Sequence, residues 1–302
     1  MTGRLKQYPL SLQLITFVGL FIAFILLYLT FLNTVFPAIS GYTLIELQNG
    51  NSADTKVVGY LKLTQFLYTF VVYLVPAVLF AWLMDKRPFT WLQLDHTPHL
   101  LPAALAILVM LSALPLVAFS SEWNQHWPIS ESARALEQQA EVLTRTMLNM
   151  PHIADLLINL VLIAILPAIA EELFFRGVLQ QLFTRAFRFG WIAVLVTAIL
   201  FSAIHGQMLG FMPRLILGFL LGAIYLLTGN LWLSIIGHFL NNGMQVVAYY
   251  LFQHKIMLTD PTKEQSVAWY SALISVAFTI ILLRLLEKKS PRRLSPALED
   301  EQ

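Results

Sequence analysis

Residues 156–176 read LLINLVLIAILPAIAEELFFR, and this stretch decides the fold. It begins as a nearly unbroken apolar run of the kind that crosses about 30 Å of hydrocarbon as a helix. Two glutamates and an arginine follow within the same helical pattern, at Glu171, Glu172 and Arg176. Ionisable side chains inside an apolar helix are costly unless they are paired or hydrated, so they mark candidate functional sites. We therefore expect a helix from about Asp155 to Phe187 that carries reactive groups.

The composition of the whole chain agrees with a membrane environment. Of 302 residues, 58% are hydrophobic and 12% are charged, about half the charged fraction of a soluble domain. We predict an all-α, polytopic integral membrane protein. Its apolar windows give about eight transmembrane helices, at residues 11–33, 62–84, 100–120, 154–182, 190–208, 212–228, 231–252 and 266–286.

Three regions follow from this division of the chain. Residues 1–150 hold the N-terminal helices and an outer loop, residues 151–250 hold the polar clusters, and residues 251–302 hold the last helix and a tail. In the outer loop, apolar residues recur at helical spacing, which predicts an amphipathic helix that lies on the surface or covers the bundle. A solvated helical loop is an equal alternative. The apolar residues are Leu136, Ala140, Leu143 and Met147.

Basic residues set the expected orientation, because Lys and Arg are enriched in cytoplasmic loops. They occur at alternate span ends, and we expect both termini in the cytoplasm of a bacterial cell, with the chain in its cytoplasmic membrane. The formal charge of +2 lacks a broad basic patch, which argues against a nucleic-acid partner. The residues that set the orientation are Arg4, Lys6, Lys86, Arg87, Arg185, Arg188, Lys288, Lys289, Arg292 and Arg293.

In the first polar cluster, two adjacent glutamates point in different directions around the helix. Glu172 and Arg176 are four residues apart, so they share a helix face and can neutralise each other. Glu171 points about 100° away and has no local partner, which makes it the candidate reactive carboxylate. The alternative is that both acids only form structural ion pairs.

Two further clusters supply imidazole and amide groups. His205 ends the fifth expected span, and His238 and Asn242 share one face of the seventh. Measured from the nearest span start, His205 would lie about 21 Å deep and His238 about 10 Å. The two histidines would then lie at different depths, unless the fifth helix is steeply tilted or starts after Trp191.

These groups suit hydrolysis by two routes. A carboxylate and an imidazole can activate water while an imidazole and an amide stabilise an oxyanion, or the same groups can hold Zn²⁺ with an open water position. Asn is a poor zinc ligand and a good oxyanion donor, which favours the route that needs no cofactor; a divalent metal stays as the alternative. The chain has no cysteine, so thiolate nucleophiles and thiolate ligands are excluded.

In these motifs the chain resembles the CPBP family, which comprises type II CAAX prenyl endopeptidases and Abi-like intramembrane proteases. The motifs are Glu-Glu-x-x-x-Arg at Glu171, Glu172 and Arg176, Phe-x-x-x-His at Phe201 and His205, and His-x-x-x-Asn at His238 and Asn242. They cover roughly residues 150–250.

The resemblance implies an intramembrane endopeptidase that acts on membrane-associated or prenylated, CAAX-like peptides. By that resemblance Glu171 activates water together with His205, His238 and Asn242 hold the oxyanion, and Glu172 and Arg176 support the geometry. The expected partners are a peptide or membrane-protein substrate and the lipid bilayer.

Two other functions use the same residues. An ion- or proton-coupled transporter also places Glu and His inside a membrane, although no inverted repeat supports it. A catalytically inactive membrane scaffold is the third possibility, and the complete set of motif residues argues against it.

Overall fold

The chain forms a bundle of membrane-length helices in the computed structural model, which describes residues 2–49, 54–261 and 266–290. No strand occurs in these ranges, so the predicted all-α class is confirmed. The expected tail falls mostly on residues 291–302, which lie outside the described residues. The first part of the bundle consists of α1 (Leu10–Thr30), α2 (Phe36–Ser40), α3 (Leu44–Asn49), α4 (Thr55–Tyr68), α5 (Val75–Met84) and α6 (Pro88–Trp91).

The second part contains the helices that carry the polar clusters. Short π-helical segments join α10, α11 and α12 into one continuous helix, as they also join α1 to α2 and α4 to α5. The elements are α7 (Leu100–Ser112), α8 (Leu114–Gln125), α9 (Glu131–Met147), α10 (Ile153–Asn159), α11 (Leu166–Glu172), α12 (Gln181–Phe187), α13 (Gly190–Ala203), α14 (Phe211–Thr228), α15 (Leu231–Gln253) and α16 (Trp269–Lys289).

Within the described residues, six of the expected spans are long and apolar enough to cross a membrane, so the chain is a polytopic membrane protein. The fifth span is shorter than predicted, because α13 ends at Ala203. At helical rise its 14 residues extend about 21 Å. Gly206 follows with a φ of 68°, a left-handed conformation that favours glycine and turns the chain. The seventh helix, α15, has the expected length but carries a polar stripe.

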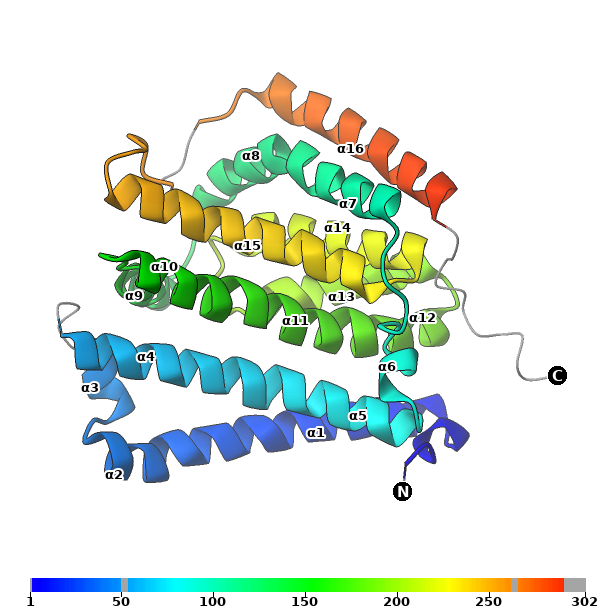
Figure 1. Ribbon diagram of the computed structural model, residues 1–302, viewed down its shortest axis with the longest axis horizontal. Coiled ribbons are helices and arrows are strands. Elements are labelled where there is room, and N and C mark those ends of the chain that lie inside the picture. The colour runs from blue at the N-terminus through cyan, green and yellow to red at the C-terminus, as the bar shows by residue number, and fades with distance from the viewer. Residues whose placement is uncertain (1, 50–53, 262–265, 291–302) are drawn as a thin grey trace.

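The helices with the polar clusters lie in the middle of the bundle (Figure 1). α1, α4 and α5 pack on one side of them, and α7, α8 and α16 pack on the other. The N-terminus, α6 and the end of α12 lie at one end of the bundle. Of the basic residues that set the predicted orientation, those within the described residues lie in or beside the elements at this end. Assignment of this end to the cytoplasm stays a prediction.

Two glycines let α14 approach its neighbours closely, as small residues do between membrane helices. A Cβ added at Gly218 would lie 3.1 Å from the ring of Phe201, and one added at Gly222 would lie 2.8 Å from Gln180 Oε1. This closeness brings the backbone carbonyls of α14 within reach of the long helix. Arg176 and Gln180 each donate a hydrogen bond of 2.9 Å to the carbonyls of Gly218 and Gly222, respectively.

Candidate active site

Glu172 and Arg176 form the predicted ion pair. Arg176 Nη1 lies 2.6 Å from Glu172 Oε1, and neither side chain is exposed. The guanidinium also donates to the carbonyl of Gly218 and lies 4.8 Å from the ring centroid of Phe201. Neutralisation at this depth requires both partners, because an unpaired buried charge is strongly destabilising. The carboxylate of Glu172 therefore serves to neutralise Arg176 inside the protein.

His238 is tied to the same carboxylate, a contact that helical spacing alone does not reveal. Its Nδ1 lies 2.8 Å from Glu172 Oε1, across 66 positions of sequence. Glu172 is held as an acceptor by Arg176, so Nδ1–H of His238 is the donor in this hydrogen bond. The ring is thereby oriented with its other nitrogen, Nε2, 4.0 Å from Glu171 Oε2.

Glu171 is the glutamate that reaches the open space of the site. Its side chain is 15% exposed, whereas that of Glu172 is fully buried. Glu171 lines two cavities, of about 210 Å³ and about 380 Å³. Of the two acids, Glu171 borders both of these cavities, where water or a substrate fits, and Glu172 borders neither.

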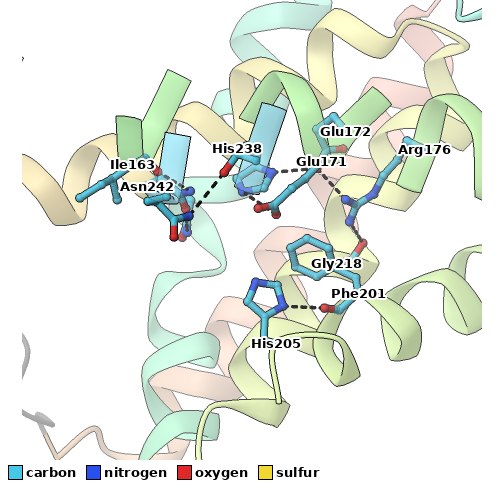
Figure 2. Close-up of polar contacts among 12 residues, drawn as sticks. Ile163, Glu171, Glu172, Arg176, Phe201, His205, Gly218, His238 and Asn242 are labelled. Carbon is cyan, nitrogen blue, oxygen red and sulfur yellow. Dashed lines mark hydrogen bonds and ion pairs between the residues drawn. The ribbon is translucent and has the colours of Figure 1, made fainter. Parts of the chain in front are cut away.

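His205 lies across the smaller cavity from Glu171 and His238 (Figure 2). Its Nδ1–H donates to the carbonyl of Phe201 at 2.7 Å, which leaves Nε2 for other contacts. In the part of the chain that the structure describes, no ring nitrogen of His205 lies within 4.0 Å of a carboxylate oxygen of Glu171. An interaction between the His205 ring and the Glu171 carboxylate therefore needs a water or substrate group between them in the cavity.

Both histidines line the smaller cavity, so the difference in depth that helix length alone would give does not keep their side chains apart. His205 lies in the turn beyond α13 rather than within the helix. Its side chain folds back to the carbonyl one turn earlier, in the direction in which helical side chains tilt. The rings of His205 and His238 consequently both pack on Phe201, at centroid distances of 5.1 and 5.9 Å.

Asn242 lies one turn after His238 on α15 and completes the polar face. Its amide nitrogen donates to the carbonyl of Ile163 at 3.1 Å, and its Oδ1 accepts a hydrogen bond from Asn241 at 3.1 Å. One of its two N–H groups is used by the Ile163 bond, so the other is available to the cavities that Asn242 lines.

The two cavities share four lining residues, three of which are predicted site residues. Both are bordered by Glu171, His205, Asn242 and Gln245. The larger one is closed in part by α9, the amphipathic helix expected from the outer loop, through Thr144 and Met147. Leu143 and Met147 also pack on the main apolar core, so α9 covers the bundle rather than forming a solvated loop.

Sequence reasoning missed three polar residues that border the smaller cavity: Arg214, Asn241 and Gln245. Arg214 could have been found, because it is the only charged residue in the expected span 212–228. Ionisable residues inside apolar runs were the criterion that identified Glu171.

Gln245 could also have been found, because it lies three residues after Asn242 and seven after His238, on the face that those two share. Asn241 is adjacent to Asn242 in the sequence, and this spacing does not identify it.

The donor set does not fit a metal ion in this arrangement. Among the described residues, no three His, Asp or Glu side chains come together closely enough to hold one. Glu172 is engaged by Arg176 and His238, and His205 faces Glu171 from a distance.

The comparison with protein families agrees with the motif positions. Residues 153–244 match the family model described as "Type II CAAX prenyl endopeptidase Rce1-like". No curated protein and no solved structure gives a significant match. The matched residues run from the start of α10 into α15 and include all six predicted site residues. Residues 153–244 of this chain thus match an Rce1-like domain, and the match covers the part of the chain that holds both cavities' motif residues.

Proposed function

We propose that this protein is an intramembrane endopeptidase that hydrolyses membrane-associated, CAAX-like peptides with water activated by Glu171. The observation that carries the proposal is the contrast between the two glutamates. Glu172 is buried in an ion pair, and Glu171 borders both cavities beside two imidazoles. A carboxylate in a site largely shielded from bulk water is a suitable general base for hydrolysis.

The attacking water would lie in the smaller cavity. The 4.0 Å between Glu171 Oε2 and His238 Nε2 is too long for a direct hydrogen bond and is a separation that a water can bridge. Glu171 takes a proton from this water while the oxygen of the water attacks the carbon of the peptide carbonyl. Glu171 later gives the proton to the leaving amine. Neutral His205 offers Nε2 as an acceptor from the opposite side, because its Nδ1–H is held by Phe201.

The tetrahedral oxyanion needs hydrogen-bond donors that are already in place. The second N–H of Asn242 is one such donor. His238 supplies another from Nε2–H when its ring carries both protons, and the carboxylate of Glu172 then stabilises the positive charge on the ring. Arg176 holds Glu172 in position, and Glu172 holds His238, so Arg176 is a positioning residue.

The larger cavity suits an apolar part of the substrate. Its walls include Met147, Leu148, Ile163, Pro167 and Val246. With a volume of about 380 Å³, it offers space for an apolar side chain or part of a lipid chain next to Glu171. A prenylated peptide would bury its lipid there while its backbone crosses the smaller cavity.

A cleavage assay tests this proposal. Purified protein in liposomes is given prenylated CAAX peptides and transmembrane peptides, with and without chelator, and products are identified by mass spectrometry. Wild type should cleave at least one peptide, Glu171→Gln should cleave none, and the exposed-site control Glu131→Gln should match wild type. Loss of cleavage with chelator, restored by Zn²⁺, would replace the metal-free mechanism.

The transporter alternative is measured in the same liposomes. Proton or cation flux that wild type supports and Glu171→Gln abolishes, without cleavage of any peptide, would contradict the protease proposal. A scaffold would show neither activity and would tolerate the substitution.

A further inference from the structure

One predicted site residue, His205, lies in a loop at one end of the bundle. The N-terminus, α6 and the end of α12 form what we call the basic end, and α9 lies at the opposite end, which we call the α9 end (Figure 1). α13 starts shortly after α12, at the basic end, and runs about 21 Å along the bundle before it ends at Ala203. The turn that follows, which contains His205, is therefore at the α9 end.

Side chains of α8 and α9 hold this turn in place. Asn124 of α8 is fully buried, and its Nδ2 donates to the carbonyl of Met208 at 3.0 Å. Glu137 of α9 accepts the N–H of Leu209 through Oε1 at 2.9 Å. The loop that carries His205 is thus bonded to α9, the helix that borders the larger cavity.

Toward the basic end, packed side chains close the site. Residues 172–180 are all buried, and in the described chain neither cavity is lined by any residue of this segment. The next residue, Gln181, donates through Nε2 to the hydroxyl of Tyr225 at 2.8 Å and to the carbonyl of Trp91 at 3.0 Å. A peptide that came from this end would have to disrupt the buried ion pair and these hydrogen bonds.

Toward the α9 end, both cavities reach exposed side chains. His205 and Gln245 line both cavities and are exposed, and Thr144 of α9 is an exposed residue of the larger cavity. α15 runs toward the same end, where Gln253 donates to Asn149, in the connection between α9 and α10, at 2.7 Å. The opening of the site is therefore at the α9 end.

The two ends of the bundle differ in their basic residues. At or beside the basic end lie Arg4, Lys6, Lys86, Arg87, Arg185, Arg188, Lys288 and Lys289. The connections at the α9 end are residues 41–54, 126–152 and 254–261; their Lys and Arg residues are Arg134, Arg145 and Lys255, and acids outnumber these bases. Because Lys and Arg are enriched in cytoplasmic loops, this bias predicts that the α9 end faces away from the cytoplasm.

We propose that substrates enter from the non-cytoplasmic face, so that the protein cleaves exported, membrane-associated peptides rather than the tails of cytosolic proteins. The inference rests on the proposed protease function. A polar peptide backbone is costly to bury without hydrogen-bond partners, so it takes the route that is open to water. That route leads past α9 and the turn of His205 to Glu171, and the apolar walls of the larger cavity lie beside it.

The sidedness of cleavage tests the proposal. The probe is a membrane-anchored peptide that detergent-solubilised protein cleaves, with a charged tag that keeps it on the side to which it is added. Right-side-out vesicles of cells that express the protein should cleave it, and inside-out vesicles should cleave it more slowly, by roughly tenfold or more, until detergent is added. Vesicles with Glu171→Gln correct for other proteases.

The outcomes of this experiment separate the two proposals. Equal or faster cleavage by inside-out vesicles would overturn the inference and leave the protease function standing. Absence of cleavage by folded wild type in detergent would instead contradict the protease function itself.

The absence of cysteine from the chain allows the two ends to be labelled separately. Glu131→Cys at the start of α9 and Lys86→Cys at the basic end both replace exposed residues. In intact cells a membrane-impermeant maleimide should label Glu131→Cys, and it should label Lys86→Cys only after permeabilisation. The reverse pattern would show that the α9 end faces the cytoplasm and would overturn the inference.

A bulky label tests the route independently of the orientation. Thr144→Cys places a thiol on the exposed part of the larger cavity wall, and Lys86→Cys is the matched control. In detergent, reaction with a maleimide-polyethylene glycol should lower the cleavage rate of Thr144→Cys by roughly tenfold or more and leave that of Lys86→Cys unchanged. An unchanged rate for labelled Thr144→Cys would show that substrates do not pass α9 and would overturn the route.

Discussion

At the scale of residues, neighbouring glutamates acquire different chemistry from where their helix places them. Glu172 faces Arg176 and His238 in the dry interior, and Glu171 faces cavities on the next position around the helix. The i, i+4 rule predicted the Glu172–Arg176 pair from the sequence. It could not predict the bond between Glu172 and His238, because spacing rules describe contacts within one helix and these residues lie on two.

The buried pair gives a prediction about stability. Arg176→Ala leaves Glu172 buried without its cation, which costs about 3 to 5 kcal/mol of the free energy of unfolding. Asn242→Ala removes a hydrogen bond to Ile163 and should cost about 1 kcal/mol. Thermal unfolding in detergent should therefore show a clearly lower melting temperature for Arg176→Ala. Equal melting temperatures for the two variants would contradict the role of the pair.

The position of a site residue in the structure was harder to predict than its identity. His205 was identified as a candidate, yet the sequence left its place relative to His238 open, because the estimate of depth counted residues from Trp191 along a helix that ends at Ala203. Apolar composition continues past the helix end, so the sequence gives no sharp boundary there. Its contact with the Phe201 carbonyl depends on a side-chain direction that an estimate of helix length omits.

At the scale of elements, α9 is an amphipathic helix that forms part of the wall of the larger cavity. Its apolar spacing predicted an amphipathic helix, and two alternatives for its location stayed open. The structure places Met147 in the cavity wall and leaves Leu136 58% exposed. One face of α9 is therefore part of the site, and another is not.

Filling the cavity from α9 should impair substrate binding. Met147→Trp adds volume where we propose that the apolar part of the substrate lies, so KM should rise by roughly tenfold with a smaller change in kcat. The matched control is Leu136→Trp on the exposed face of the same helix. Steady-state kinetics on one cleaved peptide would show it. Similar kinetics for both Trp variants would remove the larger cavity from the substrate path.

The close approach of α14 gives a prediction about packing. A Cβ at Gly222 would lie 2.8 Å from Gln180 Oε1 and 3.1 Å from Val194, so Gly222→Ala should destabilise the protein by about 1 to 3 kcal/mol. Gly59 is also helical, but a Cβ there meets nothing within 4 Å. Gly59→Ala should be neutral or stabilising, because alanine has the higher helix propensity. Urea unfolding in detergent compares the two; an equal effect would contradict the tight α13–α14 contact.

At the scale of the whole molecule, the bilayer as solvent explains why the fold class followed from composition and run length. Helices such as Leu100–Gln125 and Trp269–Lys289 are long and apolar enough to span a bilayer, and few soluble folds could bury so much apolar surface. α15 was predicted with nearly the same limits although its polar stripe makes it less apolar. How α13, α14 and α15 pack into one site depends on contacts such as Gly218 against Phe201, which no single-helix pattern encodes.

The central claim is that Glu171 activates the water, and single-turnover cleavage in liposomes tests it most directly. With one cleaved peptide and excess protein, Glu171→Gln should lower the rate by about 10² or more while its melting temperature and peptide affinity stay near those of wild type. A Glu171→Gln protein that folds, binds and cleaves at the wild-type rate would contradict the assignment.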